Sequence, residues 1–465
     1  MTNFQQTPTK AGPRYTKGSG CFLFLASILS IAVSAGCAQA QTYATIYSFK
    51  GPEGGAPHAS VIISPQGQLF GTAYGGGAYN YGAVFELSNP TGNAWIENTL
   101  YSFGGGPDGQ YPQANVVFGP GGALYGTTVG GGAGSVDGGT IFELAPPAPA
   151  GGAWTESVLY GFPSGVGVQV DAPFGAVLFD KNGNLYSTAR GEYLNVAGGV
   201  VELMPPAMPG GTWTESTVFT FGTPYAAGKN PFAGLVSESG SLYGTDYFYG
   251  DEPCGVEGCG AVYELTPPAA PGDAWTITSI YDFAGPPDDG GFSWAPLTLG
   301  TGGVLYGTTL IGGPGTVCTF EPYLISGCGT VFELTPPAAP DGTWTESVLY
   351  SFTGVNGDGA YPFAPVVLGK NGALYGTTQY GGITAGSPCK YVGAGATGCG
   401  TVFELTPPAE PGGAWIETIL HSFTGEDGDG AIPTAGLAMS SKGVLYGTTS
   451  AGGTHGNGTV FAVKP

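Results

Sequence analysis

Acidic turns are the first feature of this sequence that could do chemistry. Four of them carry an Asp-Gly pair, with Asp108, Asp289, Asp358 and Asp429, and a fifth carries Glu53-Gly54. Carboxylate oxygens are the ligands that Ca²⁺ prefers, so these side chains could bind a cation or a polar ligand around one mouth of a channel. Asp-Gly is also ordinary turn chemistry, because Asp bonds to its own backbone and Gly supplies a positive φ. No EF-hand-like spacing is present, so we favour the turn interpretation and keep the four aspartates as candidate ligand-binding residues.

Cysteines are the second feature. Six follow residue 40, in three local pairs: Cys254 with Cys259, Cys318 with Cys328, and Cys389 with Cys399. Such pairs in an exported chain indicate disulfides. A zinc site is the alternative, but no His lies nearby and no pair has Cys-x-x-Cys spacing. We therefore predict three disulfides, and neither a metal nor a cofactor.

Aromatic side chains are the third feature. Five of them fall in or near three long, glycine-rich connections: Tyr247, Tyr249, Trp294, Tyr323 and Tyr391. Rings that are apolar with a polar edge suit the recognition of sugars and of protein partners. The alternative is that these rings simply pack over the glycine-rich loops. No Ser-His-Asp, phosphate-loop, dinucleotide or zinc-protease motif is present, so no catalytic residue is assigned.

These residues are positioned by a repeat. A Leu-Tyr-Gly-Thr-Thr motif occurs seven times, with some decay, starting at Leu69, Leu124, Leu185, Leu242, Leu305, Leu374 and Leu445. Each repeat holds four runs rich in β-branched and aromatic residues, separated by Gly and Pro; in the second repeat they are 112–118, 123–129, 139–144 and 154–162. Four antiparallel strands per repeat of this length are typical of a propeller blade.

The two ends of the chain predict how the ring closes. The fourth run is marked by Trp in only six repeats, and the chain ends at Pro465 after the seventh third run. Residues 42–49 match the end of the other fourth runs, such as 348–352. We therefore predict an all-β, seven-bladed β-propeller with four antiparallel strands per blade, closed by the N-terminal strand pairing into the last blade. An open solenoid would need polar caps, and neither end resembles one.

The predicted domains are a leader, 1–40, and one propeller, 41–465. The predicted blades span about 57–103, 112–162, 173–221, 231–283, 293–352, 362–423, and 433–463 plus 42–49. Three basic residues, an apolar run and Ala38-Gln39-Ala40 are typical of a cleaved signal peptide. The apolar run is short for a membrane span. Lipoprotein processing at Cys37 is a further alternative, which we favour less.

Charge excludes some partners. Without the leader the chain has 8 Lys and Arg against 33 Asp and Glu, a net charge near −25. Phosphate backbones and anionic membrane surfaces would be repelled. We expect no nucleic acid, no membrane span after signal cleavage, and a monomer whose partner is an extracellular glycan or protein.

The repeat pattern LYGTT…GG…GTVFEL…W…LYSF resembles the GloVer (Gloeo_Verruco) tandem repeat of secreted bacterial proteins over residues 42–465. Its strand order is also similar to kelch and, more faintly, NHL propellers. The resemblance implies a secreted propeller rather than an activity. Many relatives carry a C-terminal surface anchor, whereas this chain ends inside the seventh repeat, which favours free secretion.

The function that these features favour is a secreted, non-catalytic binding or interaction module for glycans or proteins. One alternative is a polysaccharide-active hydrolase or lyase with carboxylates at the channel mouth. A second alternative is a structural surface-layer component. An enzyme should show one blade-specific carboxylate pair with a raised pKa in a cleft, whereas a binding module should show an aromatic face without such a pair.

Overall fold

The Leu-Tyr-Gly-Thr-Thr motif forms the second strand of each blade in the computed structural model of the chain. The residues described are 41–89, 92, 94–132, 138–149, 151–163, 170–190, 198–208, 210–222, 230–248, 254, 258–270, 273–320, 325–339, 342–383, 387–389, 397–410 and 412–465. Among them are seven four-stranded antiparallel sheets, and residues Gln41–Pro465 form one compact unit. The predicted all-β, seven-bladed propeller is confirmed.

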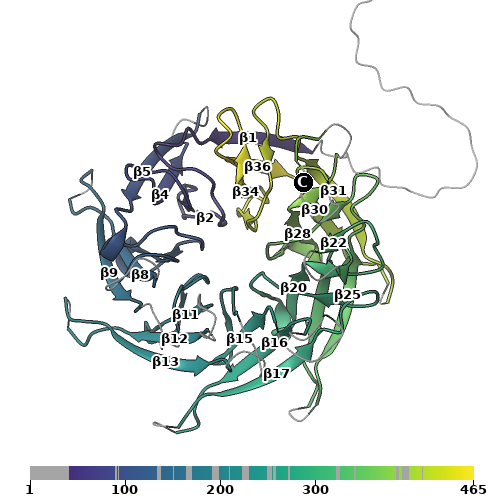
Figure 1. Cartoon of the computed structure of the whole chain (residues 1–465), viewed down its shortest axis with the longest axis horizontal. Coiled ribbons are helices and arrows are strands. Elements are labelled where there is room, and N and C mark those ends of the chain that lie inside the picture. Colours follow the sequence, from purple (N-terminus) through teal and green to yellow (C-terminus); the bar gives the residue numbers. More distant parts are fainter. Residues whose placement is uncertain are drawn as a thin grey trace, which may run out of the picture. The chain divides into compact units, whose positions relative to one another are not determined.

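In each blade the strands run from the channel outward in chain order, apart from the last blade (Figure 1). The first four sheets are β2 (Ile62–Ile63), β3 (Leu69–Ala73), β4 (Ala83–Ser88), β5 (Ile96–Ser102); β6 (Val117–Phe118), β7 (Leu124–Thr128), β8 (Thr140–Ala145), β9 (Thr155–Gly161); β10 (Leu178–Phe179), β11 (Leu185–Ala189), β12 (Gly199–Met204), β13 (Thr214–Thr220); and β14 (Val236–Glu238), β15 (Ser241–Asp246), β16 (Ala261–Thr266), β17 (Thr276–Asp282).

The other three sheets are β19 (Thr298–Leu299), β20 (Leu305–Thr309), β24 (Thr330–Thr335), β25 (Thr345–Ser351); β27 (Val367–Leu368), β28 (Leu374–Thr378), β30 (Thr401–Thr406), β31 (Ile416–Ser422); and β33 (Ala438–Met439), β34 (Leu445–Thr449), β36 (Thr459–Lys464), β1 (Thr42–Ser48). Two-stranded ladders join β18 (Gly290–Gly291) to β21 (Ile311–Gly312), β22 (Thr319–Phe320) to β23 (Ile325–Ser326), β26 (Gly359–Ala360) to β29 (Tyr380–Gly381), and β32 (Gly430–Ala431) to β35 (Ala451–Gly452). Short 3₁₀ turns are η1 (Gly106–Asp108), η2 (Pro120–Gly122), η3 (Thr301–Gly303) and η4 (Lys370–Gly372).

The ring closes as predicted. Strand β1 pairs antiparallel with β36, from Thr42 opposite Lys464 to Ser48 opposite Thr459. In Figure 1 the purple β1 lies along the outer side of the yellow β36. The seventh blade is therefore built from both ends of the propeller sequence, which leaves no open edge between the first and last blades.

The Gly of the motif is required by a neighbouring aromatic ring. A Cβ on Gly307 would lie 2.3 Å from Cζ of Phe332, its partner on the third strand. The same clash occurs at Gly71, Gly126, Gly244, Gly376 and Gly447. The third blade has Ser187 instead, and its partner there is the smaller Val201. Gly and a large ring are therefore exchanged together for Ser and Val.

The first Thr of the motif ties each blade to the next. In the fifth blade, the buried Oγ1 of Thr308 donates to the carbonyl of Ala364, 3.1 Å away, just ahead of the sixth blade's first strand. Equivalent bonds are made by Thr72, Thr127, Thr188, Thr245, Thr377 and Thr448. The bond from Thr448 to Ala59 completes the circle across the junction of the chain ends.

The hydrophobic core lies between blades. The Phe that follows each outer strand is buried against the third strand of the next blade; Phe352 meets Phe403 with ring centroids 5.1 Å apart, and Phe423 meets Phe461 at 5.1 Å. Because every blade shares its core with both neighbours, the blades stabilise one another. No helix in the described residues is long and apolar enough to cross a membrane.

Candidate functional site

One short segment per blade lines the central cavity. It precedes the first strand and begins with a residue at positive φ, such as Tyr361 at 55°. In six blades a Pro follows, and in the fifth blade Ser293 takes its place. The next residue is half-buried and faces the cavity, and we call it the cavity residue. From the first blade to the seventh, the cavity residues are His58, Gln113, Phe174, Phe232, Trp294, Phe363 and Thr434.

Four consecutive blades contribute an aromatic arc, made of Phe174, Phe232, Trp294 and Phe363. The rings of Phe232 and Trp294 are stacked, with centroids 3.9 Å apart and planes 12° from parallel. Phe174 meets Phe232 edge-on at 5.4 Å, and Phe363 lies 5.0 Å from Trp294. The guanidinium of Arg190 lies 5.1 Å from the ring centre of Phe174 and 5.8 Å from that of Phe232.

The other three blades contribute a polar arc, made of His58, Gln113 and Thr434. The Nδ1 atom of His58 lies 3.0 Å from Oε1 of Gln113, and its ring stacks on Tyr74 at 4.8 Å. Burial lowers the pKa of His58, so this ring is neutral at neutral pH. The cavity between the two arcs has a volume of about 330 Å³. One half of its wall is therefore suited to stacking and the other half to hydrogen bonding.

A smaller recess of about 250 Å³ opens beside the aromatic arc. It shares Trp294 and Phe363 with the central cavity and adds Tyr247, Tyr361 and Tyr380. Two of the aromatic residues singled out in the sequence thus come together, since Tyr247 meets Trp294 edge-on at 5.4 Å. Tyr249, Tyr323 and Tyr391 lie outside the described residues.

The four aspartates contact the outer strands of their own blades, and their role as ligand-binding residues stays a prediction. Each turn follows directly on an outer strand, so its carboxylate reaches back to that strand rather than inward. Asp108 accepts a hydrogen bond from Tyr101 of β5, and Asp289 accepts one from Tyr281 of β17 at 2.9 Å. None of the four lines the central cavity. Their main partners are turn N–H groups and the outer-strand ring, as expected for turn chemistry.

Each of three aspartates faces a Glu from the outer strand of the next blade. The pairs are Asp108 with Glu156, Asp289 with Glu346, and Asp358 with Glu417. Burial first, and the charge of the aspartate second, raise the pKa of each Glu to about 7. We call these three contacts the acid seams. Asp358 and Glu417 also line an open cleft of about 510 Å³ between the fifth and sixth blades.

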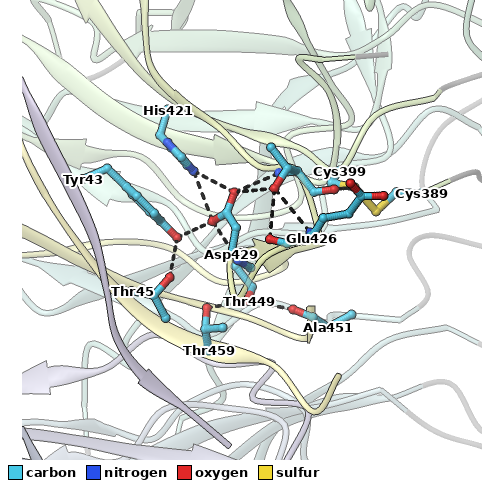
Figure 2. A network of polar contacts seen from close by, with 12 residues as sticks. Tyr43, Thr45, Cys389, Cys399, His421, Glu426, Asp429, Thr449, Ala451 and Thr459 are labelled. Carbon is cyan, nitrogen blue, oxygen red and sulfur yellow. Dashed lines mark hydrogen bonds and ion pairs between the residues drawn. A yellow bond between two sulfur atoms is a disulfide. The ribbon is translucent and has the colours of Figure 1, made fainter. Parts of the chain in front are cut away.

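The seam that joins the sixth blade to the closing strand is built differently (Figure 2). His421 replaces the outer-strand Tyr, and Tyr43 of β1 occupies the position of the facing Glu. The hydroxyl of Tyr43 donates to Oδ1 of Asp429 at 2.6 Å, and Nε2 of His421 lies 3.2 Å from Oδ2. The rings of Tyr43 and His421 are stacked, with centroids 3.5 Å apart.

These contacts stabilise the negative charge of Asp429. Burial alone would raise its pKa, but hydrogen bonds from His421, Tyr43 and the N–H of Thr424 outweigh burial and lower the pKa to about 2. Asp429 is thus an anion at neutral pH, and its carboxylate fastens the N-terminal strand to the sixth blade.

The predicted disulfides are confirmed: Cys254–Cys259, Cys318–Cys328 and Cys389–Cys399. In all three, the carbonyl of the second Cys also accepts a hydrogen bond from the positive-φ residue of the next blade, for example Cys328 from the N–H of Tyr361 at 2.8 Å. Three disulfides indicate an oxidising environment. In the part of the chain that the structure describes, no group of three His, Cys, Asp or Glu side chains could hold a metal ion.

The sequence analysis missed the cavity residues, apart from Trp294. A signal for them existed, namely the single position that follows the Pro, or Ser293 in the fifth blade, ahead of each first strand. That position varies among the blades while its neighbours repeat.

The fold and the cavity together define a disulfide-containing, seven-bladed propeller with one asymmetric aromatic cavity. The chain belongs to the Gloeobacter/Verrucomicrobia repeat family, whose model matches residues 34–256, 214–388 and 326–465. No curated protein matches the chain.

Two solved structures resemble this chain over part of its length. One is a protein assigned as a 6-phosphogluconolactonase from Bacteroides uniformis, at 13% identity and a TM-score of 0.45, covering 79% of this chain and 84% of that one. The other is an α-L-arabinofuranosidase from Clostridium thermocellum, at 14% identity and a TM-score of 0.33, covering 63% and 93%. At these values the likeness carries no argument about activity.

Proposed function

We propose that this protein is a secreted, non-catalytic binding module that takes a glycan, end first, into the central cavity. The observation that carries the proposal is the division of the cavity wall into an aromatic arc and a polar arc. A sugar ring has an apolar C–H face and an edge of hydroxyl groups, so it needs both kinds of wall. A cavity of about 330 Å³ lies at the small end of ligand sites. It suits the end of a glycan better than a broad protein surface.

The carboxylate pairs do not favour the hydrolase or lyase alternative. Asp358 and Glu417 have the raised pKa values and the open cleft that such an enzyme would need. However, the equivalent pair recurs at two further seams, Asp108 with Glu156 and Asp289 with Glu346. Because the pair recurs at three seams, we interpret it as a structural feature of the repeat. A catalytic site needs one asymmetric cluster. The asymmetric cluster in this ring is aromatic.

Binding of the purified protein to a glycan and polysaccharide array, with calcium and again with chelator, tests the proposal. We expect selective binding that the chelator does not change, because the described contacts of the seam aspartates are protein hydrogen bonds. Binding lost on chelation would return Asp108, Asp289, Asp358 and Asp429 to the role of cation ligands. A blank array under both conditions would contradict glycan recognition and favour a protein partner or self-assembly in a surface layer.

A further inference from the structure

The acid seams are assembled from the same parts each time. An outer strand supplies a Tyr, the turn after it supplies an Asp, and the next blade's outer strand supplies a Glu. The sets are Tyr101, Asp108 and Glu156; Tyr281, Asp289 and Glu346; and Tyr350, Asp358 and Glu417. Within each set, the Asp and the Tyr are the titratable groups that face the Glu from the two packed elements.

The two carboxyl groups of a seam differ in the hydrogen-bond donors around them. Asp289 accepts hydrogen bonds from the Tyr281 hydroxyl at 2.9 Å and from the Ala284 N–H at 2.6 Å. By contrast, one carboxyl oxygen is buried without a hydrogen-bond partner in Glu156, in Glu346 and in Glu417. In the described residues no cation pairs with these three Glu. Hydrogen-bond donors thus surround the Asp, whereas the buried oxygen of the Glu beside it has no donor that would stabilise a negative charge.

Other junctions of the ring are built from different residues. Between the third and fourth blades the connecting residues 222–230 contain no acid. There Phe219 stands in place of the Tyr and Ile277 in place of the Glu. At the closing seam, the partner of Asp429 is the donor Tyr43 instead of a Glu. The seventh blade's turn, with Glu53 facing Glu97, has Lys50 close by, and that cation sets it apart from the three acid seams.

We propose that Glu156, Glu346 and Glu417 are protonated in the folded propeller, and that ionising them as the pH rises through neutrality weakens the contacts between blades. The sign follows from linkage. A Glu with a pKa of about 7 in the fold and 4.5 when unfolded contributes stability that is fully present below pH 4.5. That stability is lost as the pH rises through about 7. The blade contacts therefore tighten in mildly acidic surroundings, independently of any ligand in the cavity.

The test compares the purified protein with a triple variant, Glu156→Gln, Glu346→Gln and Glu417→Gln, in which an amide mimics the neutral acid. Melting temperatures are measured from pH 5 to pH 8. We expect the wild-type melting temperature to fall by about 2–5 °C more over this range than that of the triple variant. The matched control is Glu215→Gln, at the same strand position in the third blade, because residues 163–170 ahead of it contain no acid. It should keep the wild-type slope.

The number of protons released on unfolding is a second, independent test of the proposal. Near pH 6, calorimetry in buffers of different ionisation heat should show the wild type releasing about two to three more protons on unfolding than the triple variant does. If the triple variant does not fold, Glu417→Gln alone should remove about one proton. Equal proton release and equal pH slopes in the wild type and the variants would overturn the proposal.

Discussion

At the scale of residues, the repeat motif is explained by two contacts. The Gly leaves room for an aromatic ring of the third strand, which a Cβ at that position would overlap. The first Thr donates a hydrogen bond to a backbone carbonyl just ahead of the next blade's first strand. The third blade supports the first point, since Ser187 there faces Val201 rather than a ring. Decay of the motif in that blade is therefore a compensated exchange.

The exchange can be transferred to the fifth blade. Gly307→Ser alone should destabilise the protein by about 2–3 kcal/mol, because its Cβ would overlap Phe332. Adding Phe332→Val removes the ring and should recover part of that loss, so the double variant should be more stable than Gly307→Ser alone. Chemical denaturation of the three variants measures this. A double variant whose loss equals or exceeds the sum of the two single losses would refute the explanation.

At the scale of elements, the closing strand is distinguished by one carboxylate. Asp429 joins the turn after β31 to Tyr43 of β1 and to His421. The other outer strands carry Glu or Ile where β1 carries Tyr43. The N-terminal strand is thus fastened by a donor–anion contact rather than by a pair of acids.

The lowered pKa of Asp429 predicts how its contribution depends on pH. A carboxyl with a pKa of about 2 in the fold and 3.8 when unfolded contributes stability that is present above pH 4. That stability is lost as the pH falls toward 2. Asp429→Asn should therefore be less stable than the wild type at pH 7, and the difference should shrink between pH 4 and pH 2. Glu426→Gln, at an exposed neighbouring position, is the control. It should have the stability of the wild type at pH 7 and the same dependence on pH. A constant difference across this range would contradict the assignment.

At the scale of the whole molecule, much of the ring could be predicted from the sequence, because each strand pattern recurs in several blades and each copy supports the others. Seven motifs, six Trp-marked strands and the fragment 42–49 together indicated the blade count and the closure. The cavity was largely missed because the residue type at its position changes around the ring, from His58 and Gln113 to Trp294 and Thr434. The seams were missed because Asp108 and Glu156 are brought together only by blade packing.

Closure itself predicts a global effect. Deleting Thr42–Phe49 removes β1, its ladder with β36 and the Tyr43–Asp429 contact. It would leave the last blade with three strands and an open edge. We expect a large drop in melting temperature for the whole propeller together with a tendency to aggregate. Differential scanning calorimetry with light scattering measures both, and an unchanged melting temperature would refute the shared seventh blade.

The central claim is that the aromatic arc binds a glycan, and calorimetric titration tests it most directly. The oligosaccharide selected on the array is titrated into the wild type, into Trp294→Thr, which copies the cavity residue of the seventh blade, and into Tyr79→Ala, an exposed ring that lines neither recess. We predict that Trp294→Thr weakens binding by about tenfold, at an unchanged fold, while Tyr79→Ala binds as the wild type does. Wild-type affinity in Trp294→Thr would contradict the claim.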